Sequence, residues 1–70
     1  MNTFKELETV ALLKNIPEHN MYRGDVGVIV SLLSDDTVEV EFSNKDGKTV
    51  ALIPVQTTHL IKLRMQPAAV

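Results

Sequence analysis

The residues of this 70-residue chain that could carry chemistry start with its two histidines, His19 and His59. A zinc site takes three or four converging ligands, and the chain has no cysteine. Carboxylates from separate turns would therefore have to complete any site. We expect His19 to be a solvated loop residue and His59 to lie at the edge of a short helical turn. The sequence predicts neither a metal site nor another cofactor.

The hydroxyl and carboxyl groups also lack the arrangement of an active site. None of the serines sits in a strand-to-helix nucleophile elbow; they are Ser31, Ser34 and Ser43. The clustered carboxylates fall on a turn and on a solvated strand face; they are Asp35, Asp36, Glu39 and Glu41. An acid–base pair needs a pocket, and a small barrel fills its interior with side chains. We predict a non-catalytic protein without a small-molecule substrate.

The stretch "RGDVGVIV" at residues 23–30 contains two glycines three positions apart. Gly24 can take backbone angles barred to other residues where a loop enters a strand. Gly27 lies inside the strand, where it permits a bulge, a sharp coil or the close approach of another backbone. No helix start follows, which argues against a phosphate loop. The main prediction is a barrel corner.

The same stretch is similar to part of the KOW motif, whose loop can touch RNA. The alternative function is therefore a KOW-like nucleic-acid-binding barrel that uses Arg23, Lys45 and Lys48. The net charge of −2 and the scattering of the seven cations along the chain argue against it, because binding to phosphates needs many cations on one surface.

Short strands and tight turns must position these residues. Alternation and turn residues predict strands within 7–16, 25–33, 37–43, 48–55 and 60–64, with Pro54 ending the fourth ladder. Residues 16–25 are expected to form a long surface loop, and residues 56–60 a helical turn. This pattern is typical of an all-β fold, a small five-stranded SH3-like barrel. We assign residues 1–6 to a lead-in, 7–64 to the barrel and 65–70 to a flexible tail.

The most informative feature is the apolar character of both strand faces. We expect the core to contain Val10, Leu12, Val26, Val28, Val30, Val38, Val40, Phe42, Val50 and Leu52. Strict alternation then sends other apolar residues outward: Ala11, Leu13, Ile29, Leu33, Ala51 and Ile53. Barrel ends, covered edges and bulges that shift the alternation are one explanation. The other is an exposed apolar patch for self-association or docking, beside loop anchors Met21 and Tyr22 and the basic Arg23.

Nearly the whole chain, Leu7 to Leu63, resembles a bacterial family catalogued as domain of unknown function 4926. The shared motifs are "VALL" at 10–13, "PEH" at 17–19, "RGDVG" at 23–27, "VEVEF" at 38–42, "DG" at 46–47 and "AL" at 51–52. Asn20 stands where the family usually has glycine, and Val28 where threonine is common. The resemblance implies the barrel fold. It also implies a small companion of a neighbouring gene product, of the antitoxin or immunity type.

The pattern of apolar and basic residues predicts the cellular location of the protein. Residues 1–20 have neither the basic start nor the long apolar run of a signal peptide, and the apolar runs are too short to span a membrane. We expect a cytoplasmic protein that does not bind membranes. The predicted function is a small interaction module, self-associating or bound to a protein partner. A further alternative is a ligand-binding or catalytic accessory domain, with the chemistry itself carried out by another chain.

Overall fold

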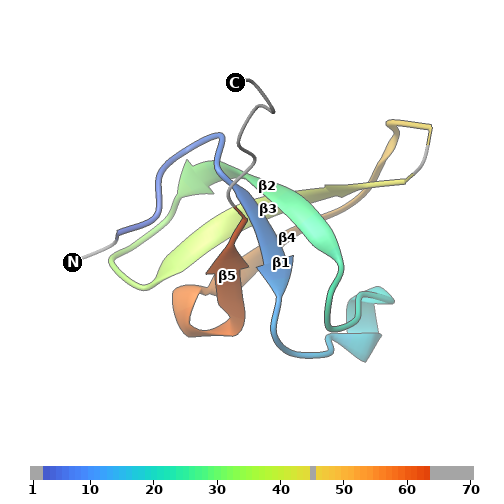
Figure 1. Ribbon diagram of the computed structural model, residues 1–70, viewed down its shortest axis with the longest axis horizontal. Coiled ribbons are helices and arrows are strands. Elements are labelled where there is room, and N and C mark those ends of the chain that lie inside the picture. The colour runs from blue at the N-terminus through green and yellow to red at the C-terminus, as the bar shows by residue number, and fades with distance from the viewer. Residues whose placement is uncertain (1–2, 45, 64–70) are drawn as a thin grey trace, which may run out of the picture.

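Five antiparallel strands form one strongly curved sheet in the computed structural model, which describes residues 3–44 and 46–63 (Figure 1). Short 3-10 helices stand in the first and last connections. The elements are β1 (Thr9–Leu12), η1 (Pro17–His19), β2 (Val26–Leu32), β3 (Thr37–Ser43), β4 (Thr49–Gln56), η2 (Thr57–His59) and β5 (Leu60–Lys62). The predicted all-β class, the five strands and the helical turn before the last strand are confirmed. The tail assigned to residues 65–70 lies outside the described residues.

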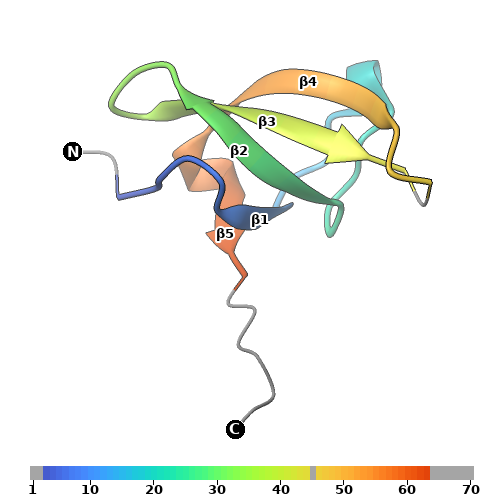
Figure 2. The same ribbon diagram turned by 90° about the horizontal axis from the view of Figure 1, so that it is seen from above.

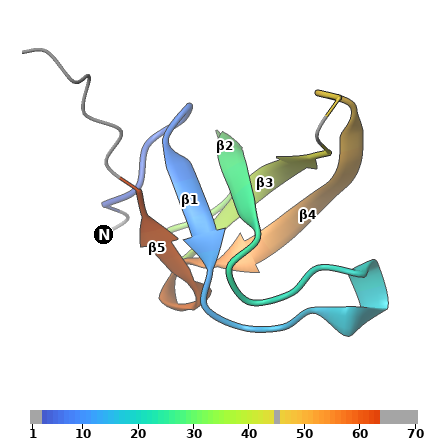
Figure 3. The same ribbon diagram turned by 45° about the vertical axis from the view of Figure 1, so that its right-hand side comes forward.

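The strand order in the sheet is β4-β3-β2-β1-β5. The sheet coils so that its two edge strands curl toward each other (Figures 2 and 3), but backbone hydrogen bonds do not join β4 to β5 in the described part of the chain. The barrel is therefore curled but not closed by hydrogen bonds. η2 bridges the two edges, and its first residue is tied to the β2–β3 turn, since the Thr57 N–H donates to the Asp36 carbonyl at 2.8 Å.

Strand β3 sets the division between core and solvent. Its sequence TVEVEFS alternates β-branched or aromatic residues with glutamates, and Val38, Val40 and Phe42 are buried while Glu39 and Glu41 are partly exposed. A period of two places alternate side chains on opposite faces. Around β3, one core cluster forms inside the curl; it contains Phe4, Val10, Leu12, Met21, Ile29, Val38, Val40, Phe42, Ile53, Val55 and Leu60.

The two glycines of "RGDVG" have different structural roles. Gly24 has a φ of 94° and its N–H donates to the Leu12 carbonyl at 2.8 Å, so it turns the loop into β2. Gly27 allows a close approach. An added Cβ would lie 2.6 Å from Val40 Cγ1 and 2.8 Å from the Glu41 carbonyl oxygen. The β-bulge predicted as one option at Gly27 lies instead between Ile29 and Ser31.

Two local predictions need correction. Strand β4 does not end at Pro54 but continues to Gln56, with Pro54 opposite Glu39. A proline is tolerated there because β4 is an edge strand, where half of the N–H groups have no strand to face. The loop after β1 is also more ordered than expected. It contains η1 and an Ile16–Met21 bridge, and Asn20 closes η1 with a φ of 57°, a left-handed conformation that asparagine accepts.

Candidate interaction surface

The inside and the outside of β2 and β4 are the reverse of the prediction. Ile29 and Ile53 were expected to face solvent, but Ile29 is 0% exposed and Ile53 is 3% exposed. Both lie opposite the buried Val40 of β3, and side chains of paired residues share a face. The predicted exposure of Ile29 and Ile53 is wrong because these strands carry apolar residues in both phases, so alternation alone does not choose the buried one.

The other predicted surface residues divide into two groups. Met21 is only 7% exposed and belongs to the core cluster, and Ala51 is half-buried against that cluster. Their expected exposure is therefore also wrong. Met21 forms a backbone bridge with Ile16, and its side chain joins the core cluster against which Ile16 also packs. The remaining four are exposed, but they lie in the β1–β2 and β2–β3 connections rather than on one strand face; they are Leu13, Tyr22, Arg23 and Leu33.

Reversing the phase puts a different set of apolar residues on the outer face. Val26 is 49% exposed and Leu52 is 53% exposed, although both were predicted to be core. Ala11 faces the outer side as predicted and pairs with both Val26 and Ile61, which makes one apolar row across β2, β1 and β5, although Ala11 itself is only 9% exposed between its neighbours. Val28 and Leu52 lie on either side of Glu41 in a second row. We call this surface the outer sheet face; it comprises Ala11, Val26, Val28, Glu39, Glu41, Leu52 and Ile61.

The charge on the outer sheet face is entirely acidic. Glu39 and Glu41 stand two positions apart on β3 and are both partly exposed. The Thr49 hydroxyl donates a hydrogen bond to Glu41 Oε2, which orients that carboxylate from β4. The face thus has apolar side chains on both sides of Glu41, whereas Glu39 lies between Ser31 and Pro54, and none of its residues is a lysine or an arginine.

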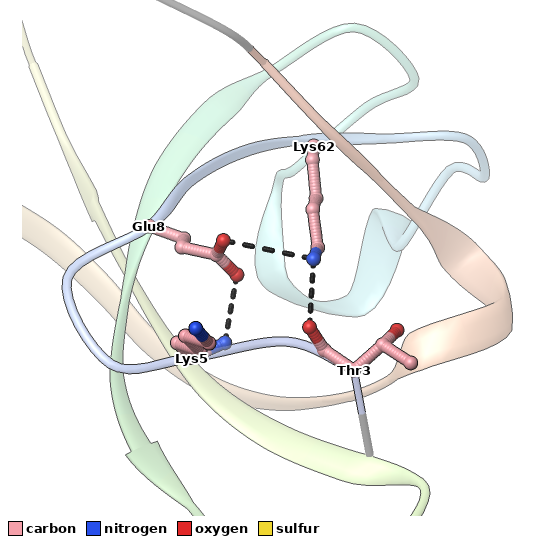
Figure 4. Close-up of polar contacts among 4 residues, drawn as sticks. All are labelled: Thr3, Lys5, Glu8 and Lys62. Atoms are coloured by element: carbon pink, nitrogen blue, oxygen red, sulfur yellow. Dashed lines mark hydrogen bonds and ion pairs between the residues drawn. The ribbon is translucent and has the colours of Figure 1, made fainter. Parts of the chain in front are cut away.

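Lys62, which follows the face residue Ile61 in β5, makes its contacts on the opposite side of the sheet. Lys62 lies opposite Val10, on the side of the sheet away from the outer face. Its ammonium donates to the Thr3 carbonyl at 2.6 Å and lies 3.6 Å from Glu8 (Figure 4). It also sits 5.2 Å from the centre of the Phe4 ring. Glu8 also accepts a hydrogen bond from the Lys5 N–H. Lys62 therefore fastens the lead-in segment over one end of the core.

The two histidines line one open groove of about 520 Å³ between the η1 loop and the edge strand β4. His19 and His59 line it with Lys14, Glu18 and Gln56. This convergence was not anticipated, because the residues are forty positions apart in sequence. Among residues 3–44 and 46–63, however, no group of three or more metal-ligating side chains is placed to hold an ion. The groove offers hydrogen-bonding side chains and the exposed rings of Pro17 and Pro54.

The loop that resembles a KOW motif is held by its own polar groups. The Asp25 carboxylate accepts a hydrogen bond from the Tyr22 N–H, and the Asn15 side chain accepts one from the Arg23 N–H, both at 2.8 Å. The Asp25 backbone carbonyl also accepts a hydrogen bond from the Leu12 N–H at 2.9 Å. These contacts account for the motif as a turn between β1 and β2. Lys45, one of the cations of the nucleic-acid alternative, lies outside the described residues.

Comparison with known proteins gives one match. The family model described as "Domain of unknown function (DUF4926)" matches residues 6–62, which contain every strand of the sheet. No curated protein and no solved structure matches significantly. In the described part of the chain, no helix is long and apolar enough to cross a bilayer.

Proposed function

The chain belongs to the DUF4926 family, a family defined by a domain of unknown function, and from that premise we propose that it is a small protein-interaction module that uses its outer sheet face. The proposal includes an accessory or antitoxin-like role in the cytoplasm, bound to a partner protein. The observation that carries it is the exposure of Val26, Leu52 and Ile61 on one side of a sheet whose other side forms the core.

An apolar strand face of this kind is unusual on an isolated small domain. Where one face of an antiparallel sheet meets water, polar residues normally alternate with the buried ones. Strand β3 follows that rule, whereas β2 and β4 place valine and leucine on the solvent side. Contiguous exposed apolar residues bordered by polar ones are typical of docking surfaces. The burial of such a face by a partner also stabilises a domain whose core is small.

Site-specific photo-crosslinking tests this proposal. A benzophenone amino acid replaces Leu52 on the outer sheet face in one variant and Leu33 in the other. The two leucines have similar exposure, 53% and 49%, but Leu33 lies in the β2–β3 turn, so it is a matched control. After irradiation in the cells that produce the protein, we expect a discrete protein adduct at position 52 and none at 33.

Two results would count against the interaction module. One is the absence of an adduct at position 52. The other is the same adduct at both positions, which indicates random collisions. An adduct that nuclease treatment removes would support the nucleic-acid alternative instead. Circular dichroism of both variants shows whether they are folded before the comparison is made.

A further inference from the structure

We propose that the occupant of the outer sheet face is a basic amphipathic segment of a partner protein, with lysine or arginine side chains set among apolar ones. This inference rests on the proposed function and adds the chemistry of the partner. Its basis is the pattern on the face, where Glu41 lies between Val28 of β2 and Leu52 of β4, and Glu39 follows on the same side of β3 between Ser31 and Pro54.

The carboxylates restrict which partner can cover the face. Covering Val28 and Leu52 also covers Glu41, because Glu41 is paired with both of them. Removing water from a carboxylate costs much free energy unless a cation pairs with it. Thr49 supplies Glu41 with a single neutral hydrogen bond. The partner must therefore bring a cation to Glu41 and apolar side chains to Val28 and Leu52 on either side of it.

A second copy of this chain does not meet that requirement. Two copies apposed through the same face would bring four carboxylates into the interface. The face carries no lysine or arginine to receive them, and Lys62 points to the other side of the sheet, where it binds Thr3 and Glu8. Like charges that meet across an interface suppress that pairing, so charge complementarity favours a different, basic partner over self-association.

The dimensions of the face favour a segment over a globular surface. Measured along its curve, a sheet of five strands about 4.8 Å apart is about 19 Å wide, and seven residues of strand are about 23 Å long. A helix of about 15 residues is about 22 Å long and about 10 Å in diameter. One such helix laid along β3, with apolar and basic residues on its contact side, reaches Val28, Leu52 and the two carboxylates of β3.

Designed peptides test the chemistry directly on the full chain. Three 16-residue peptides share one leucine and alanine framework and carry lysine, glutamate or glutamine at the polar positions. Binding is measured by fluorescence anisotropy against the wild type, Leu52→Ser and the double variant Glu39→Gln/Glu41→Gln. The double variant Glu18→Gln/Asp35→Asn is the matched control, because it removes two exposed carboxylates that lie off the face and changes the net charge equally.

We expect the lysine peptide alone to bind the wild type. Its affinity should fall about tenfold in Glu39→Gln/Glu41→Gln, as for two solvent-bordered ion pairs, fall strongly in Leu52→Ser, and change less than twofold in the control. Equal binding of all three peptides, no binding of the lysine peptide, or equal losses in both charge variants would overturn the inference. A dimer in sedimentation that Leu52→Ser dissociates would also overturn it, while leaving the proposed interaction face intact.

Discussion

Replacing Gly27 with alanine should destabilise the protein, although most glycine-to-alanine changes inside a strand have the opposite effect. Alanine normally stabilises a strand position by about 0.5–1 kcal/mol, because glycine loses more backbone freedom on folding. At Gly27 the new methyl group would lie 2.6 Å from Val40 Cγ1, 2.8 Å from the Glu41 carbonyl oxygen and 2.9 Å from Phe42 Cδ1. Carbon atoms pack favourably at about 3.5–4.0 Å, so β2 and β3 must separate by nearly an ångström.

The expected cost follows from those contacts. Overpacking a core by one methyl group costs about 1–3 kcal/mol, and one of the three contacts is a backbone oxygen that side-chain rotation does not move. After the gain in backbone entropy is subtracted, we expect a net loss of about 1 kcal/mol. A core of this size supplies about 3–5 kcal/mol. With a urea m-value near 1 kcal/mol/M for a small domain, the unfolding midpoint should fall by about 1 M.

The assay is urea unfolding followed by circular dichroism, with two comparison variants. Gly47→Ala has open space around the new methyl group but a φ of 79°, so it costs about 1–2 kcal/mol through backbone strain alone. Val40→Ala removes one of the three contacts. In Gly27→Ala/Val40→Ala, the combined loss should therefore be smaller than the sum of the single losses. A Gly27→Ala protein as stable as the wild type would refute the close pairing of β2 with β3.

Three further outcomes are expected. Leu52→Ser should change the free energy of unfolding by less than about 0.5 kcal/mol, whereas Ile53→Ser should cost about 3 kcal/mol, because only Ile53 is buried; equal losses in urea unfolding would contradict the phase of β4. Hydrogen bonds from the Ser34 and then the Thr37 hydroxyl hold the pKa of Asp36 below its ordinary value of 3.8; this contribution to stability is complete above that value and is lost as the pH falls through the lower folded pKa. An NMR titration of the Asp36 carboxyl should show the lowered pKa and its rise in Ser34→Ala, and an unchanged midpoint in that variant would refute the cause. Lys62→Met should cost about 0.5–1 kcal/mol at low salt and less at high salt, since its ion pair with Glu8 is partly exposed; thermal unfolding at two salt concentrations measures the difference, and a loss independent of salt would exclude the ion pair as its source.

The architecture was largely predictable because turn residues and β3 carry unambiguous patterns. Glutamates at 39 and 41 leave one possible inner face for β3, and the Asn44–Lys48 turn and Gly24 mark the strand ends. The phase of β2 was not predictable by alternation, because "VGVIV" is apolar at every position except glycine. Pairing with β3 supplies the missing information. Gly27 lies opposite Phe42 and Ile29 opposite Val40. A prediction of the buried face of β2 therefore requires the register of the β2–β3 hairpin, which the sequence of β2 does not contain.

Bulges explain why that register was hard to infer. One irregularity lies between Ile29 and Ser31 of β2. The other lies in β4, where Ala51 pairs with Phe42 and Thr49 with Ser43, so that Val50 has no partner in β3. Each adds a residue to one strand and shifts the alternation beyond it. The candidate surface was therefore predicted in kind, as an apolar strand face, but assigned to residues of the opposite phase. The groove that joins His19 to His59 had no sequence signal, because only the curl of the sheet brings the β4 edge beside η1.

The strand order has a consequence for how the chain folds. Strands β2, β3 and β4 pair with their neighbours in sequence through short turns, whereas β1 must pair with β5, about fifty residues later. Contacts between distant segments form slowly because closing a long loop costs entropy before any contact is gained. During synthesis, β1 emerges before the other strands of the sheet and keeps one edge unpaired until Leu60–Lys62 has left the ribosome. The shortest strand thus completes the sheet, after β2, β3 and β4 have become able to pair.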